Sequence, residues 1–132
     1  MAEFVSFQEF LDTTGFDIVL MELIRIRVSQ INGCAHGIRR HTRAARSLGE
    51  SEDRINRLDA WHTAPLYSEQ ERAGFGWAEA VTLMYRTPIP DGVFEVARQW
   101  FSEEDLVKLT MIIAATDAWN RLEMSFHHVP TF

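Results

Sequence analysis

The residues around Cys34 are those expected of a reactive thiol, and Cys34 is the only cysteine among the 132 residues. A helix that begins near Cys34 would favour the thiolate, because its free N–H groups and its dipole stabilise an anion. Positive charge on the same stretch adds to this effect, from His36, Arg39, Arg40, Arg43 and Arg46. A two-cysteine redox motif would carry its second thiol at position 37, where this chain has Gly37. Cys34 is therefore a candidate nucleophile without its redox partner, and the alternative is a small apolar side chain buried behind a tight turn.

His41 and Glu22 are the candidate proton-transfer groups. His41 follows Cys34 by seven residues, so on a helix the two share a face but lie about 10 Å apart along the axis. The i,i+4 neighbour of His41 is position 37, so a base at His41 would serve a group there. Glu22 lies in a mostly apolar stretch, with Arg25 three residues on. We expect Glu22 to be a general base or proton relay that reaches Cys34. The alternatives are a surface ion pair with Arg25 and a structural role for His41.

The elements that must position these groups are predicted to be helices throughout. Apolar residues at helical spacing, capping residues and Gly or Pro breaks predict helices over 6–15, 17–30, 34–48, 51–61, 68–85, 91–100 and 102–124. Capping boxes are predicted at Ser6 and Ser68. The last helix is apolar nearly all round, which predicts a central position or cover by another subunit. The sequence therefore predicts one all-α domain over residues 1–132.

Composition narrows the classes of function. Hydrophobic residues make up 46% and charged residues 24% of the chain, as in a soluble globular protein. The formal net charge of −6 argues against a nucleic-acid partner. No apolar run approaches the length of about 18 residues that a membrane span needs. No secretory signal is visible and a single cysteine fits a reducing cytosol, so we expect a cytoplasmic protein.

No metal or cofactor is expected. The side chains of ligand type are Glu22, Cys34, His36, His41, His62, His127 and His128. Their spacing does not match a zinc motif. The chain also lacks a glycine-rich phosphate loop and a dinucleotide fingerprint.

The candidate residues stand in the register of a known family. Glu22, Cys34 and His41 keep the spacing of a motif that reads Glu, eleven residues, Cys, two residues, Cys, three residues, His. Further segments match in order between residues 16 and 126: Ser29–Cys34, His41–Ala45, Glu71–Ala73, Trp77–Ala80 and Ala118–Arg121. The chain thus resembles the alkylhydroperoxidase D-like group of the carboxymuconolactone decarboxylase superfamily, and it departs from that group at Gly37.

The resemblance implies an all-helical fold that forms an obligate homo-oligomer, either a trimer or a hexamer. Two-cysteine members cycle between dithiol and disulfide, and they reduce hydroperoxides as antioxidant proteins or relay electrons to a peroxiredoxin. In those members the Glu and the His are proton relays. The decarboxylase branch acts on an anionic lactone without a redox pair. By resemblance, the catalytic residues of this chain are Cys34, His41 and Glu22.

Gly37 leaves three functions open. In the first, Cys34 is the nucleophile of a one-cysteine thiol peroxidase. It attacks a hydroperoxide, becomes a sulfenic acid and is reduced by an external thiol or a redox protein. The third function is a binding or structural oligomer without catalysis. The second function is described in the next paragraph.

The second function is a non-redox enzyme for a small anionic substrate. Because Gly37 has no side chain, we expect it to leave space between Cys34 and His41. Glu22 and His41 would then be the acid and the base. The substrate would be held by Arg39, Arg40 and Arg43, because guanidinium groups pair well with carboxylates. The alternative for these arginines is a solvated surface paired with nearby acidic residues.

Overall fold

The computed structural model describes residues 1–127 and consists of helices joined by short connections. This range holds seven α-helices: α1 (Ala2–Asp12), α2 (Ile18–Asn32), α3 (Ala35–Ser47), α4 (Glu52–Asn56), α5 (Glu69–Thr82), α6 (Asp91–Trp100) and α7 (Glu103–Phe126). A short 3-10 helix, η1 (Leu58–Ala60), follows α4. The prediction of a single all-α domain is confirmed. His128, one of the ligand-type residues named above, lies outside the described residues. Within 1–127, each helix is too short or too polar to cross a membrane.

Serine side chains cap three of the helices, as their positions in the sequence suggest. Each hydroxyl oxygen accepts a backbone N–H from three residues further on, at Ser51, Ser68 and Ser102. The predicted capping box at Ser68 is complete, since the Glu71 carboxylate accepts the N–H of Ser68 at 2.7 Å. These contacts satisfy N–H groups that have no partner inside the helix.

Several predicted helix limits are wrong. The helix predicted over 68–85 ends at Thr82, and Ser6, predicted to begin a capping box, lies inside α1. The first helix begins at Ala2 rather than Ser6, because the backbone is already helical there and the Met1 carbonyl accepts the N–H of Val5. The helix predicted over 51–61 is two pieces, α4 and η1. Arg57, with φ of −103° and ψ of 7°, interrupts the helical geometry between them.

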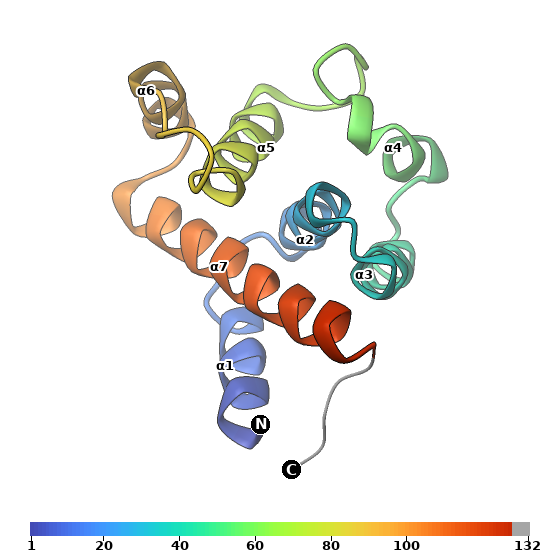
Figure 1. Cartoon of the computed structure of the whole chain (residues 1–132). Coiled ribbons are helices and arrows are strands. Elements are labelled where there is room, and N and C mark those ends of the chain that lie inside the picture. The colour runs from blue at the N-terminus through green and yellow to red at the C-terminus, as the bar shows by residue number, and fades with distance from the viewer. Residues whose placement is uncertain (128–132) are drawn as a thin grey trace.

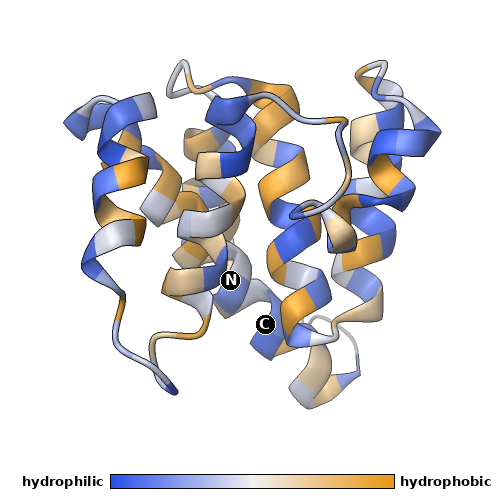
Figure 2. Ribbon diagram, turned by 90° about the horizontal axis from the view of Figure 1, so that it is seen from above, coloured by the Kyte–Doolittle hydropathy of each residue, from blue (hydrophilic) through white to orange (hydrophobic). Residues whose placement is uncertain are grey.

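The central helix of the molecule is α2. Figure 1 shows it in the middle of the view, and α3, α5 and α7 all pack against it. Leu23, Ile24 and Val28 of α2 have no exposed surface. Figure 2 shows hydrophobic and hydrophilic residues alternating along the helices, as expected of helices with one side towards a core. Because α2 is enclosed, its polar residues Glu22 and Arg25 are buried as well.

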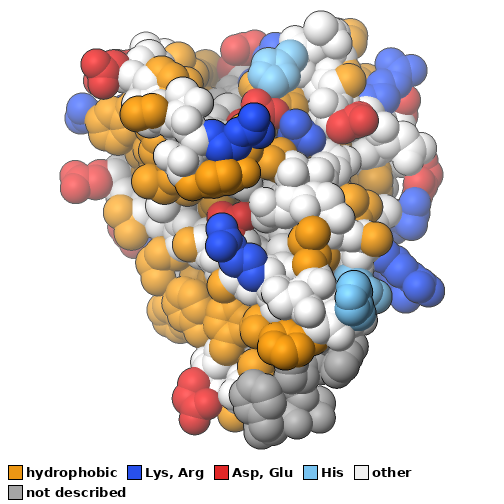
Figure 3. All heavy atoms as spheres, in the orientation of Figure 1, with side chains coloured by type: hydrophobic (Ala, Val, Ile, Leu, Met, Phe, Trp, Pro, Cys, Tyr) orange, Lys and Arg blue, Asp and Glu red, His pale blue; other side chains and the backbone are white. Residues whose placement is uncertain are grey.

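The long helix α7 crosses one face of the molecule (Figure 1) and is covered on one side only by the described chain. Leu109 and Ile112 are fully buried, whereas Val107 is 54% and Met124 is 45% exposed. Figure 3 shows apolar side chains gathered on the left and lower left of this face, where α7 and α1 lie. The prediction of a central helix holds for one side of α7, and cover of its other side by a subunit stays a prediction.

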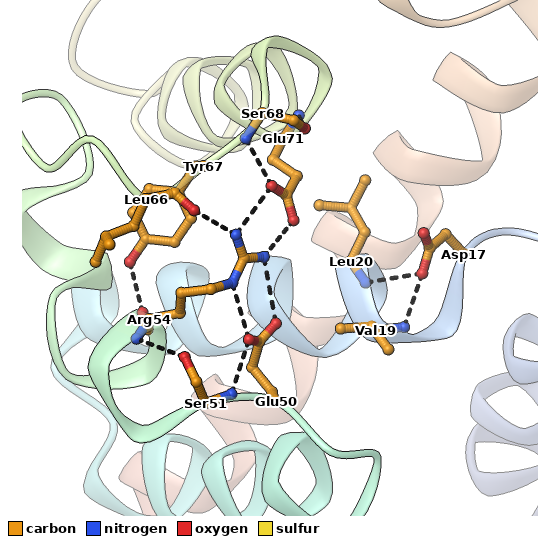
Figure 4. A network of polar contacts seen from close by, with 10 residues as sticks. All are labelled: Asp17, Val19, Leu20, Glu50, Ser51, Arg54, Leu66, Tyr67, Ser68 and Glu71. Atoms are coloured by element: carbon orange, nitrogen blue, oxygen red, sulfur yellow. Dashed lines mark hydrogen bonds and ion pairs between the residues drawn. The ribbon is translucent and has the colours of Figure 1, made fainter.

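Arg54 fixes the connection between α4 and α5. Its guanidinium donates to the carboxylates of Glu50 and Glu71 and to the carbonyl of Leu66, and the Tyr67 hydroxyl donates to the Arg54 carbonyl (Figure 4). The Arg54 side chain is only 23% exposed, so these charges are largely shielded from bulk water. The network ties the loop before α5 to α4 and is structural.

Candidate functional site

The turn between α2 and α3 places Cys34 inside the protein. Gly33 ends α2 with a left-handed φ of 70°, which a residue with a Cβ rarely adopts. The N–H of Gly33 donates to the Gln30 carbonyl at 3.1 Å and that of Cys34 donates to the Ser29 carbonyl at 2.9 Å. Cys34 then caps α3, where its Sγ accepts the N–H of Gly37 at 3.4 Å. The sulfur therefore stands at a helix start, as the sequence suggests.

Cys34 is nevertheless enclosed and faces a carboxylate. The residue is 1% exposed. Its Sγ lies 4.0 Å from Oε2 of Glu123 in α7, and Glu123 is also 1% exposed. A carboxylate at this position accepts the thiol proton and opposes a second negative charge on the sulfur. The sulfur therefore accepts an N–H at the start of α3 and faces a carboxylate of α7.

Arg40 compensates the charge of Glu123. Its Nη1 lies 2.5 Å from Oε1 of Glu123, so the two side chains form an ion pair. The angles at this contact do not meet those of a hydrogen bond. The guanidinium also lies over the ring of Trp119, with its central carbon 5.7 Å from the ring centroid. The Arg40 side chain is 42% exposed. Arg40 therefore extends from the buried Glu123 to the protein surface.

The space expected beside Gly37 does not exist. A Cβ at this position would stand 2.5 Å from Oγ of Ser29 and 2.7 Å from Oδ1 of Asn120. Ser29 is 0% and Asn120 is 1% exposed, and the Ser29 hydroxyl donates to Oδ1 of Asn120 at 3.3 Å. The prediction that Gly37 opens room for a substrate is therefore wrong, because two buried side chains already occupy it.

Glu22 and His41 form a hydrogen-bonded pair between α2 and α3. Nδ1 of His41 lies 2.8 Å from Oε2 of Glu22, and Oε1 of Glu22 accepts from Arg25 at 2.8 Å. Burial raises the pKa of Glu22, but the hydrogen bonds and charges of His41 and Arg25 outweigh it, so this pKa lies below its ordinary value. Glu22 is therefore ionised at neutral pH and accepts the Nδ1–H of His41. The lone pair of Nε2 is then available to act as a base.

Arg25 extends this pair to α1. Its Nη1 is also 3.0 Å from Oδ1 of Asp12, and its Nη2 donates to Oε1 of Gln8 at 3.5 Å. Glu22 is 7% and Arg25 is 5% exposed, so their ion pair is buried rather than on the surface. One chain of polar contacts therefore joins α1, α2 and α3.

A cavity of about 280 Å³ opens onto this polar chain. Apolar surface comes from Val5, Ala44 and Trp119, and the polar lining comprises Gln8, Glu9, Asp12, Glu22, Arg25, Arg40 and His41. Cys34 does not line it. The acid–base pair therefore meets the cavity, and the sulfur does not.

Of the three arginines predicted to hold an anion, only Arg40 reaches the cavity. Arg39 and Arg43 are exposed and lie outside its lining. The sequence interpretation missed Glu123, although a carboxylate inside a helix that is apolar nearly all round was a signal. It also missed Asp12, whose role depends on how α1 packs. Among residues 1–127, no three His, Cys, Asp or Glu side chains are grouped as a metal ion would require.

Comparison with known proteins places this chain in a family. Residues 2–80 match the sequence profile of the Carboxymuconolactone decarboxylase family. YdfG, an uncharacterised protein of Bacillus subtilis (strain 168), is 42% identical over 104 residues, which cover 79% of this chain and 71% of YdfG. The chain belongs to the carboxymuconolactone decarboxylase family. The match to the family profile ends within α5.

Solved structures extend the similarity to nearly the whole chain. One is a protein of unknown function from Agrobacterium tumefaciens, described as a candidate antioxidant defence protein AhpD. It is 37% identical, with a TM-score of 0.93 over 99% of this chain and 90% of that chain. A peroxidase-related protein from Silicibacter sp. TM1040 is 22% identical, with a TM-score of 0.85 over 98% of this chain and 69% of its own, and shows the fold alone. The expected alkylhydroperoxidase D-like fold is therefore confirmed.

Proposed function

We propose that this protein is a small-molecule enzyme in which His41 is the general base and Glu22 orients it. Nε2 of His41 takes a proton from a carbon next to a carbonyl group, and the C–H electron pair moves into the enolate. The ionised Glu22 stabilises the protonated imidazole, which then returns the proton to the enolate. The observation that carries this proposal is that Glu22 and His41 line the cavity and Cys34 does not.

Arg40 is the donor to the oxygen of the enolate in this proposal. Its Nη1 is engaged by Glu123, but a guanidinium has five N–H donors. The others can donate to an oxygen in the cavity while the ion pair with Glu123 stays intact. Donors that face a developing negative charge lower the barrier to its formation.

A one-cysteine thiol peroxidase is the second candidate function. The N–H of Gly37 on Sγ supports it, and so does the similar Agrobacterium protein described as a candidate antioxidant protein. Cys34 would attack a hydroperoxide, becoming a sulfenic acid and releasing an alcohol. One external thiol would then form a mixed disulfide with release of water, and a second would restore the Cys34 thiol, so that the two external thiols leave as a disulfide. This function requires movement that opens the site, because Cys34 is 1% exposed.

Deuterium exchange at a carbon next to a carbonyl tests the first function. In D2O the natural protein is expected to speed the exchange of the benzylic protons of phenylacetone, followed by NMR. His41→Gln is expected to lower the catalysed rate about 10²- to 10⁴-fold. Cys34→Ser is the matched control and is expected to keep the natural rate. No acceleration by the natural protein, or an unchanged rate in His41→Gln, would contradict the proposal.

A further inference from the structure

Each guanidinium at the cavity is already paired with a carboxylate. We propose that the cavity takes a small uncharged molecule, with a largely apolar body and one hydrogen-bonding group, and that it rejects carboxylates. This inference rests on the proposed function for the location of the site. It departs from the anionic substrate that the arginine-rich sequence suggests.

Arg25 is shared between two carboxylates. It lies 2.8 Å from Oε1 of Glu22 and 3.0 Å from Oδ1 of Asp12. The side chains of Arg25 and Glu22 are 5% and 9% exposed. An incoming anion that took Arg25 would leave Glu22 buried without its cation, and an uncompensated buried charge is strongly unfavourable.

Arg40 is likewise paired with a buried carboxylate. Its partner Glu123 has a side chain that is 2% exposed, so Glu123 cannot turn to water if Arg40 leaves. A carbonyl or hydroxyl group can bind without drawing Arg40 away from Glu123, because it needs only one N–H group of Arg40 that Glu123 does not contact. The pairing of Arg40 therefore favours a neutral acceptor over a competing carboxylate.

The α1 side of the cavity adds further negative charge. Glu9, Asp12 and Glu22 line the cavity against Arg25 and Arg40, so three carboxylates face two guanidinium groups. These five side chains together carry one net negative charge. A ligand carboxylate would meet repulsion from this lining and would compete with Glu22 and Glu123 for their guanidinium partners.

The remaining lining and the size of the cavity define the body of the ligand. Val5, Ala44 and Trp119 offer apolar surface. The volume of about 280 Å³ lies just below the roughly 300–1,000 Å³ found for sites of drug-sized ligands. A single ring with a short polar chain fits these limits, with its polar group near Nε2 of His41 and the free N–H groups of Arg40.

Three compounds with the same skeleton separate the effect of charge from that of shape. Phenylacetamide is neutral, phenylacetate is an anion and phenethylamine is a cation. NMR titration would follow the assigned indole N–H signal of Trp119. Phenylacetamide is expected to bind with a Kd about tenfold lower than that of phenylacetate. The inference is overturned by equal or tighter binding of phenylacetate, by tightest binding of phenethylamine, or by no saturable shift with any of the three.

Two aspartate variants test whether the local ion pairs set the preference. Asp12→Asn leaves Arg25 with one carboxylate and is expected to raise the affinity for phenylacetate. Asp59→Asn makes the same charge change at an exposed site in η1, outside the cavity lining, and is expected to leave affinity unchanged. Equal effects of the two variants would overturn the explanation from local pairing.

His41→Gln separates this inference from the proposed function. The variant loses the base but keeps Arg25, Arg40 and their carboxylates, so it is expected to keep the preference for phenylacetamide. Absence of proton exchange with this preference intact would refute the proposed function alone. A preference for phenylacetate with proton exchange intact would refute this inference alone.

Discussion

Glu123 is expected to slow reactions in which the sulfur of Cys34 attacks as an anion, because its Oε2 lies 4.0 Å from Sγ in buried surroundings. Glu123→Gln is expected to increase the rate at which iodoacetamide alkylates Cys34 near neutral pH about tenfold, since a carboxylate beside the sulfur repels the negative charge of the attacking group. Cys34 is the only cysteine, so the thiol signal of the whole protein reports it alone. Glu103→Gln, at the exposed start of α7, is the control. An equal or lower rate in Glu123→Gln would show that this carboxylate does not restrain the thiol.

Gly37 is a packing residue at the contact of α3 with α2 and α7. Gly37→Ala is expected to lower the free energy of unfolding by about 1–3 kcal/mol, because the new Cβ must displace Ser29 and Asn120. The control is Gly92→Ala in α6, where the added Cβ meets nothing within 4 Å. This control is expected to stabilise by up to about 1 kcal/mol. Urea unfolding measures both variants, and Ser29→Ala is expected to restore part of the loss in Gly37→Ala. Equal stabilities of the two glycine variants would contradict this account.

At the scale of helices, the elements were predictable because their limits depend on local signals. Gly33 ends α2 and Ser68 begins α5 through contacts within a few residues. The pair of Glu22 with Arg25 follows from i,i+3 spacing alone. Its burial and its link to Asp12 could not be predicted, because they depend on how α1 packs beside α2.

The contacts through which Glu22 helps to join α1, α2 and α3 are expected to weaken in acid, so the stability of the protein should depend on pH. The folded-state pKa of Glu22 lies below its ordinary value of 4.5. Its contribution to stability is therefore fully present above pH 4.5 and is lost as the pH falls through the lower folded value. Glu22→Gln is expected to be less stable near neutral pH and to lose less stability in acid, as measured by urea unfolding across this range. Glu103→Gln is expected to keep the natural profile, and an identical profile in Glu22→Gln would refute this role.

At the scale of the whole molecule, exposed apolar side chains on α6 and α7 motivate the proposal of a homo-oligomer. They are between 39% and 54% exposed, at Phe94, Val96, Trp100, Val107 and Met124. Such a concentration is typical of an interface. Sedimentation equilibrium is expected to give a trimer or a hexamer of the 15.2 kDa chain. Val107→Lys is expected to weaken the assembly, whereas Ser47→Lys on exposed α3 is not. A sample containing only monomer would refute the proposal.

The fold of the whole molecule could be predicted from the sequence, but the cavity could not. Helix periodicity predicts the all-α fold, and the register of Glu22, Cys34 and His41 indicates the family from the sequence alone. The cavity brings Val5 of α1 together with Trp119 of α7, residues whose proximity depends on packing between distant helices. The family resemblance groups Cys34 and His41 in one site, whereas in the structure only His41 lines the cavity.

The central claim is that chemistry in this protein belongs to Glu22 and His41 rather than to Cys34. The most direct test is consumption of cumene hydroperoxide in the presence of excess dithiol, with the natural protein and Cys34→Ser measured side by side. We expect the two to give the same rate, equal to that of the dithiol alone, because the sulfur is enclosed and faces Glu123. Turnover by the natural protein that disappears in Cys34→Ser would contradict the claim and establish a one-cysteine peroxidase.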